Sequence, residues 1–157
     1  MEQSERRKYL IKYLIGEKPE YEQIEIPQTE SGQRQLLRGL MNVRMPKAIS
    51  KDFLEVQDEY LKEAAREKGV VNLSDTEKMQ DGIYLWQGDI TRLALDAIVN
   101  AANSGMTGCY RPNHSCIDNC IHSFGGIQMR LECAKIMDEQ GYAEPTGKAK
   151  ITAEFAV

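Results

Sequence analysis

The spacing of apolar residues changes near residue 80, and this change most constrains the fold that the chain can form. Before residue 80, apolar residues recur at helical spacing. After it, short apolar runs alternate with turn residues and one longer helical stretch. An order of strand, loop, strand, loop, helix and strand is typical of an α/β sheet with crossover helices. We therefore predict an α/β fold over residues 80–157, preceded by a helical N-terminal lead over residues 1–79.

The lead is expected to contain three helices. The first two cover roughly Glu2–Ile15 and Ser31–Val43, and the second stops before Pro46 because a proline disfavours helix at the residue before it. Ser50 is expected to cap the third helix, and Gly69 to follow its end, since these residue types suit helix starts and ends. These helices are interpreted as packing elements without chemistry of their own.

Three segments after residue 80 are expected to be strands. They are "IYLWQGD", the apolar run Ala97–Val99 within "LDAIVNAAN", and "GKAKITAEF". A short apolar run bounded by turn residues suits a buried parallel strand. Apolar residues recurring from Ile117 to Gln140 predict one long helix between the second and third strands.

Composition argues against two classes of function. The formal net charge is −4 with acids and bases mixed, whereas a broad nucleic-acid surface would show a basic patch. No apolar run approaches the roughly 18 residues of a membrane span, and the N-terminus is too charged for a secretory signal. We expect a cytoplasmic protein, in which the four cysteines serve metals, catalysis or packing more often than disulfides.

A cluster of metal-ligand residues follows the second expected strand. Cys109, His114 and Cys116 have the spacing C-x4-H-x-C, and Pro112 and Asn113 allow the chain to turn back between them. Thiolate and imidazole are favoured zinc ligands. The spacing therefore predicts a metal site, and the alternative is packed or free cysteines beside an incidental histidine.

The number of ligands would decide what such a site does. Three protein ligands and an open position describe a catalytic zinc, whereas four describe a closed structural one. Cys120 is the candidate fourth ligand, since it lies four residues after Cys116 on the same helical face. His122 is a weaker candidate. The positive end of the helix dipole is expected to favour the Cys116 thiolate.

Candidate ligand-binding residues follow two of the expected strands. Asp89 and Ile90 end the first, and Asn100 and Asn103 end the second. In open α/β sheets, ligands bind beyond the carboxyl ends of the strands. Asp89 could accept a hydrogen bond from an exocyclic amine, and Asn103 could bind ribose hydroxyls. The alternative is that these residues only form turns.

The residues "GDIT…DAIVNAANSGMTGC…CIDNCIH" resemble a macrodomain, the module that binds ADP-ribose. The segment "GCYRPNHSC" stands where ordinary macrodomains carry a glycine run. It resembles the zinc-containing subclass, bacterial protein-ADP-ribose hydrolases with a helical N-terminal lead. The resemblance covers roughly Ile83 to Thr152 and implies a three-layer α/β/α sheet.

The resemblance also implies a role for each site residue. Asp89 and Ile90 would meet the adenine, and Asn103 would reach the distal ribose beside a zinc held by the three predicted ligands. Cys116, Ile117 and Asp118 would approach the ADP-ribose at the helix start. The implied reaction is zinc-dependent hydrolysis of the bond between ADP-ribose C1″ and a protein side chain, with Asp118 positioning or deprotonating the water. The implied substrate is a mono-ADP-ribosylated carrier protein, often lipoylated.

Two further expectations complete this interpretation. A non-catalytic reader that binds ADP-ribose without turnover is the alternative, and a closed zinc site with Cys120 as fourth ligand would favour it. The glycine-rich loop that cradles the diphosphate in macrodomains has no counterpart after Thr152. We therefore expect the N-terminal portion of a macrodomain, with an incomplete sheet, weak ADP-ribose binding and little activity.

Overall fold

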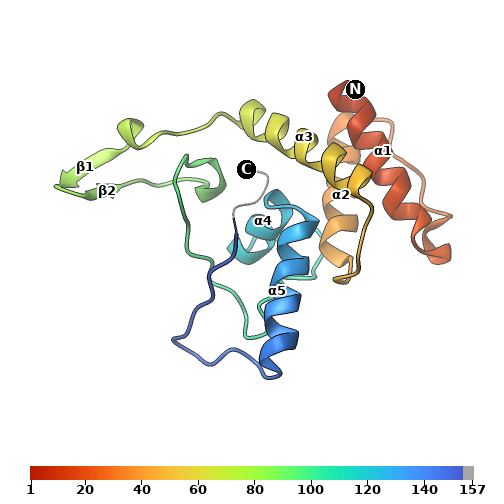
Figure 1. Ribbon diagram of the computed structural model, residues 1–157. Coiled ribbons are helices and arrows are strands. Elements are labelled where there is room, and N and C mark those ends of the chain that lie inside the picture. Colours follow the sequence, from red (N-terminus) through yellow and green to blue (C-terminus); the bar gives the residue numbers. More distant parts are fainter. Residues whose placement is uncertain (154–157) are drawn as a thin grey trace.

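Three long helices form the first half of the chain in this computed structural model, which describes residues 1–153 (Figure 1). They are α1 (Gln3–Gly16), α2 (Glu30–Val43) and α3 (Lys51–Lys68), and α1 packs against both of the others. These elements confirm the three helices predicted for the lead. The division of the chain at residues 79 and 80 stays a prediction.

Capping residues set the ends of these helices. Thr29 Oγ1 accepts a hydrogen bond from the Gly32 amide at 3.2 Å, and Ser50 Oγ accepts one from the Phe53 amide at 3.2 Å. Each satisfies an amide that has no partner within its helix. Gly69 follows α3 with φ +82°, a conformation that glycine adopts without steric cost. The predicted cap and helix end are confirmed.

The core of the lead lies where the apolar faces of α1, α2 and α3 meet, and Ile127 from a later helix closes it. Phe53 is fully buried there, with its ring centroid 4.9 Å from that of Tyr13. Burial of such side chains contributes about 1.5–3 kcal/mol each. The buried members are Leu10, Ile11, Leu14, Leu37, Leu40, Met41, Phe53, Tyr60, Leu61 and Ile127.

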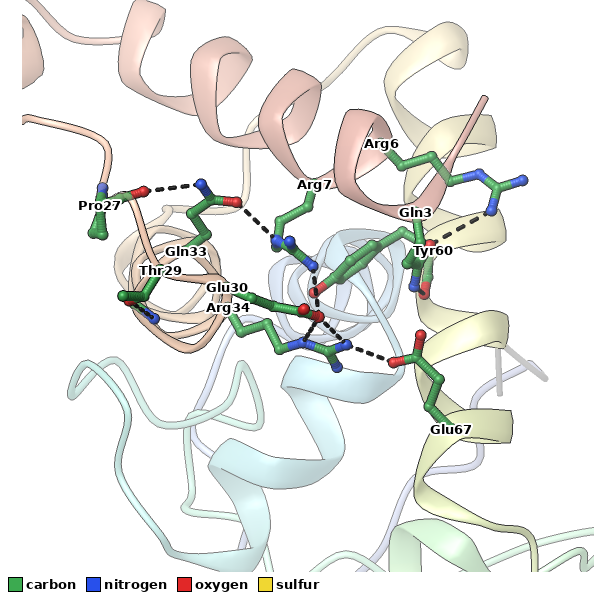
Figure 2. Close-up of polar contacts among 11 residues, drawn as sticks. Gln3, Arg6, Arg7, Pro27, Thr29, Glu30, Gln33, Arg34, Tyr60 and Glu67 are labelled. Atoms are coloured by element: carbon green, nitrogen blue, oxygen red, sulfur yellow. Dashed lines mark hydrogen bonds and ion pairs between the residues drawn. The ribbon is translucent and has the colours of Figure 1, made fainter.

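A buried arginine joins α1 to α2 at the edge of this core (Figure 2). Arg7 Nε donates to Gln33 Oε1 at 3.1 Å, and Arg7 Nη1 lies 3.3 Å from Glu30 Oε1. On α2, Arg34 pairs with Glu30 and with Glu67 of α3, each at 2.6 Å. These ion pairs connect the three helices of the lead.

A two-stranded antiparallel hairpin follows α3 along the chain and projects away from the helices (Figure 1). It consists of β1 (Glu77–Gln80) and β2 (Ile83–Leu85), and Gly82 in the turn between them has φ +74°. β2 confirms the strand predicted in "IYLWQGD". β1 is a strand that the apolar pattern does not reveal, because all four of its residues are exposed.

The other two predicted strands do not form within residues 1–153. The run Ala97–Val99 has no strand partner and Val99 is 87% exposed. The segment 147–153 is also unpaired, and Ile151 is 91% exposed, while residues 154 and 155 of that prediction lie outside the described residues. A parallel strand needs neighbouring strands and covered faces, and no described strand lies beside either segment. The predicted mixed α/β class is confirmed, with the small sheet of β1 and β2.

The long helix predicted for Ile117–Gln140 is two helices, α4 (Ile117–Phe124) and α5 (Ile127–Gln140). Gly126 between them has φ +83°, and Gln57 Oε1 of α3 accepts the Ile127 amide hydrogen at 3.0 Å. A Cβ at Gly126 would lie 2.5 Å from Gln57 Nε2. The tertiary contact with Gln57 therefore replaces a helical hydrogen bond and breaks the helix.

An open cavity of about 690 Å³ lies between the unpaired segments and the last two helices. Its lining includes apolar groups such as Ile98, Val99 and Met129, with the polar side chains of Asn100 and His122 among them. None of the helices among residues 1–153 combines the length and apolarity needed to cross a membrane.

Candidate metal centre and neighbouring carboxylate

The loop before α4 brings two cysteines and a histidine together. The ligand atoms of Cys109, His114 and Cys116 all lie within 4.8 Å of one another, and Cys109 Sγ lies 3.6 Å from His114 Nδ1. Asn113 turns the chain back toward His114 with φ +54°, a conformation that asparagine adopts more readily than most residues. The structure thus brings together the three ligands predicted from their spacing.

This group of donors fits a zinc ion. Zinc lies about 2.3 Å from sulfur and 2.0–2.1 Å from imidazole nitrogen in tetrahedral sites, which requires roughly 3.3–3.8 Å between donors. The sulfur–nitrogen distance of 3.6 Å agrees with this requirement. Cys120 and His122 are not among the convergent donors that residues 1–153 offer. The loop therefore offers three candidate ligands, the number of protein ligands that a catalytic zinc uses.

Cys116 is both a candidate ligand and the N-cap of α4. Its Sγ accepts a hydrogen bond from the Asn119 amide at 3.4 Å. The sequence predicts that the helix start favours the thiolate, but burial raises the pKa of the Cys116 thiol more than this amide lowers it. A cation beside the sulfur would favour the thiolate.

Asp118 lies in the first turn of α4, two residues after the last candidate ligand. It is 5% exposed, and both of its oxygens accept hydrogen bonds. Asn100 Nδ2 donates to Oδ1 at 2.9 Å, and Asn103 Nδ2 lies 3.2 Å from Oδ2. The two asparagines predicted to end a strand therefore converge on the carboxylate predicted at the helix start. An ionised carboxylate has about four lone-pair sites, so Asp118 retains acceptor capacity.

A buried histidine lies beneath this carboxylate. His122 Nε2 is 3.7 Å from Asp118 Oδ1, and neither ring nitrogen has a hydrogen-bond partner among residues 1–153. Burial lowers the pKa of His122 to about 4 against the favourable charge of Asp118. The ring packs against Gly108, whose φ is +85° and where a Cβ would lie 2.7 Å from His122 Cγ. His122 is therefore a neutral packing group under the metal loop, the segment 109–116 that carries the three candidate ligands.

The residues expected to meet adenine, Asp89 and Ile90, lie after β2 and outside the loop and helix that carry the candidate ligands and Asp118. Asp89 Oδ1 accepts hydrogen bonds from the Thr91 amide at 3.0 Å and the Thr91 hydroxyl at 2.6 Å, and Lys68 Nζ lies 3.4 Å from Oδ2. Asp89 thus caps a short 3-10 helix (Ile90–Arg92), as the turn-forming alternative predicts. Ile90 lines the large cavity. Ile117 is half-buried as the first residue of α4.

One residue that the sequence analysis did not single out joins the parts of this site. Asn119 is fully buried, and its Nδ2 donates to the carbonyl oxygens of Cys109 at 3.2 Å and Arg111 at 2.9 Å. It therefore holds the backbone of the metal loop against α4. The sequence carries one signal for this role of Asn119 in holding the loop. It is an asparagine three residues after Cys116, on the buried side of the predicted helix.

A comparison with known families supports the predicted resemblance to a macrodomain. Residues 99–157 match the family model described as Macro domain. This match includes the metal loop, α4 and α5, so the resemblance predicted from the motifs is confirmed over those residues.

The chain is also similar to individual proteins named protein-ADP-ribose hydrolase. One from Treponema medium is 57% identical over 159 residues, a match covering 99% of this chain and 61% of that protein. Another, from Staphylococcus aureus strain COL, is 45% identical over 151 residues, covering 96% and 56%. A probable bifunctional ADP-ribose hydrolase/ADP-ribosyltransferase of Fusarium oxysporum f. sp. cubense is 36% identical over 133 residues, covering 78% and 22%. The chain thus spans little more than half the length of the first two relatives.

Proposed function

We propose that this chain carries the zinc centre and the catalytic carboxylate of a protein-ADP-ribose hydrolase. The observation that supports this proposal most strongly is the convergence of three metal ligands on a loop whose next helical turn presents a buried, amide-held aspartate. The similarity to named protein-ADP-ribose hydrolases extends over nearly the whole chain and supports the same reaction.

In the proposed reaction a water oxygen attacks C1″ of the distal ribose, and the bond from C1″ to the protein side chain breaks. Zinc held by Cys109, His114 and Cys116 would supply Lewis-acid polarisation at the ribose. Asp118 orients the attacking water and accepts its proton. The released side chain takes up a proton, and ADP-ribose leaves.

The asparagines beside Asp118 have two roles in this proposal. Their amides fix the orientation of the carboxylate, because each donates to a different oxygen. Asn103 also contacts the distal ribose, since its amide group offers a donor and an acceptor to hydroxyl groups. Loss of Asn103 therefore weakens both substrate binding and the alignment of Asp118.

The remaining proposed contacts lie at the two ends of the ligand. Asp89 and Ile90 bind the adenine, which requires Asp89 to exchange part of its pairing with Lys68 for the ligand. Cys116, Ile117 and Asp118 approach the ADP-ribose at the start of α4, where backbone amides favour an anion.

The substrate and the cellular location are part of the same proposal. We propose a mono-ADP-ribosylated protein as substrate, with a lipoylated carrier protein as the candidate to test first. A cytoplasmic location agrees with four free cysteines, since thiols persist in a reducing compartment.

A second function, a reader that binds without turnover, is favoured by one observation. Both oxygens of Asp118 already accept amide hydrogens, which is also how a purely structural carboxylate is held. Replacing Asp118 by Asn separates the two functions, because this change removes the proton acceptor and keeps the size of the group.

The test measures release of ADP-ribose from a modified carrier protein, with enzyme in excess, alongside the zinc content of each variant. Asp118→Asn is expected to keep zinc and lose turnover, whereas His114→Ala is expected to lose both. Turnover in Asp118→Asn equal to that of the unaltered chain would exclude Asp118 as the acceptor. Absence of turnover in every form, together with ADP-ribose binding, would favour the reader.

A further inference from the structure

Helix α2 lies against the metal loop although it belongs to the helical lead. It packs against α4, and one of its faces meets the turn that carries His114. At Gly39 a Cβ would lie 3.1 Å from Asn113 Nδ2 and 3.9 Å from Pro112 Cβ. A side chain larger than glycine at this position would therefore press on the turn between the first two candidate ligands.

Arg38 of α2 makes the most direct polar contact with the candidate ligands. Its Nη2 donates to the His114 carbonyl oxygen at 2.8 Å and to Asn119 Oδ1 at 2.8 Å. The same nitrogen lies 3.5 Å from Cys120 Sγ. One guanidinium thus contacts the backbone of a ligand and the side chain that holds the rest of the loop.

Asn119 extends this contact to the other end of the loop. Its Oδ1 accepts from Arg38, and its Nδ2 donates to the carbonyl oxygens of Cys109 and Arg111. Because Asn119 is fully buried, its amide has no water to replace a lost partner. A continuous path of hydrogen bonds therefore runs from α2 to the backbone of two of the three ligands.

Asn42, one turn further along α2, holds the turn itself. Its Oδ1 accepts the Asn113 amide hydrogen at 2.9 Å, and its Nδ2 donates to Ser123 Oγ at 2.8 Å. Asn42 is 1% exposed. The residue with positive φ that turns His114 back toward Cys109 is thus fixed by the lead as well as by the hydrogen bond from the His114 amide to the Arg111 carbonyl oxygen within the loop.

These contacts differ from those that hold the lead together. Within residues 1–153, the hydrogen bonds donated by the Arg38 side chain all go to residues of the metal loop and α4, and none goes to the lead. Arg34, one turn earlier on the same helix, pairs with Glu30 and Glu67 of the lead and with no other carboxylate in the described part of the chain (Figure 2). Arg34 therefore connects α2 to the rest of the lead, whereas Arg38 connects α2 to the candidate metal centre.

We propose that α2 is a wall of the metal centre and that Arg38 is a positioning residue for its ligands. Arg38 acts through the His114 carbonyl and through Asn119, and it does not touch the metal. This inference rests on the proposed zinc site. It gives the helical lead a role in metal binding, so the Macro domain segment alone, without α2, holds its ligands loosely.

Cobalt(II) binding tests this proposal without measuring catalysis. Thiolate-to-cobalt absorption of the whole chain is titrated in the unaltered form, in Arg38→Met and in the control Arg34→Gln. Arg38→Met keeps most of the side-chain length and removes the donors. Loss of such supporting groups typically weakens metal binding about 10–100-fold, and we expect a loss in this range. Arg34→Gln is expected to bind cobalt like the unaltered chain.

A second variant and a second measurement keep the proposal testable if Arg38→Met does not fold. Arg38→Lys keeps the charge but lacks the planar group that reaches two acceptors at once, so its affinity is expected to lie between the unaltered chain and Arg38→Met. Hydrogen exchange of the amides in residues 109–116, measured without metal, is expected to quicken in both Arg38 variants and not in Arg34→Gln.

The outcomes are distinguishable. Unchanged cobalt affinity in Arg38→Met, or in Arg38→Lys if the first variant does not fold, overturns the role of Arg38 and leaves the proposed zinc site standing. Equal weakening in Arg34→Gln and Arg38→Met also overturns it, because general loss of the lead would then explain the effect. Absence of thiolate-to-cobalt absorption in the unaltered chain refutes the zinc site itself, and the role of Arg38 with it.

Discussion

Replacing Gly108 by Ala should destabilise the chain through His122. Gly108 has φ +85°, and its added Cβ would lie 2.7 Å from His122 Cγ and 2.8 Å from Cδ2. The left-handed backbone costs an L-residue about 1–2 kcal/mol. Overpacking a buried site costs about 1–3 kcal/mol more, and His122 is 4% exposed. We expect a loss of about 2–5 kcal/mol in the free energy of unfolding.

Gly141→Ala is the matched control for this substitution. Gly141 ends α5 with φ +77°, and its added Cβ would meet nothing within 4 Å. It should therefore lose only the backbone contribution of about 1–2 kcal/mol. Urea unfolding of the metal-free chains, with unchanged m-values, measures both losses. Equal losses for the two alanine variants would refute the steric argument and the packing of His122 beneath the metal loop.

Two other predictions concern buried groups. Because the pKa of His122 is lowered from 6.5 to about 4, the unfolded chain binds more protons between these values. His122 should therefore contribute stability that is fully present above pH 6.5 and is lost by on the order of 3 kcal/mol as the pH falls toward 4. His122→Leu should reduce this pH dependence in urea titrations, and an unchanged slope would contradict the argument. Gln57→Leu leaves the buried Ile127 amide without its acceptor. This change should lower the free energy of unfolding by about 1–3 kcal/mol. An unchanged urea midpoint would show that α5 needs no cap from α3.

The elements that sequence alone predicted are those set by local chemistry. Ser50 and Gly69 mark the ends of α3 because caps and positive φ depend on residues within one turn. The spacing of Cys109, His114 and Cys116 likewise predicted a convergent group, because a short turn suffices to bring them together.

The features that sequence did not predict depend on contacts between distant residues. The break at Gly126 follows from Gln57, which lies 70 positions away from the amide it accepts. Ala97–Val99 has the composition of a buried strand, but a strand also needs a partner, and none lies beside it among residues 1–153. Arg38 reaches Asn119 across 81 positions, so helical spacing in the lead could not indicate its contact with the metal loop.

Zinc content of four forms of the chain tests the central claim most directly. The unaltered chain and Cys120→Ala are expected to retain stoichiometric zinc after dialysis, because Cys120 lies outside the convergent donors. Cys109→Ala and His114→Ala are expected to lose it, since each removes one of three ligands. Zinc that is absent from the unaltered chain, or lost on replacing Cys120, would contradict an open three-ligand centre beside Asp118.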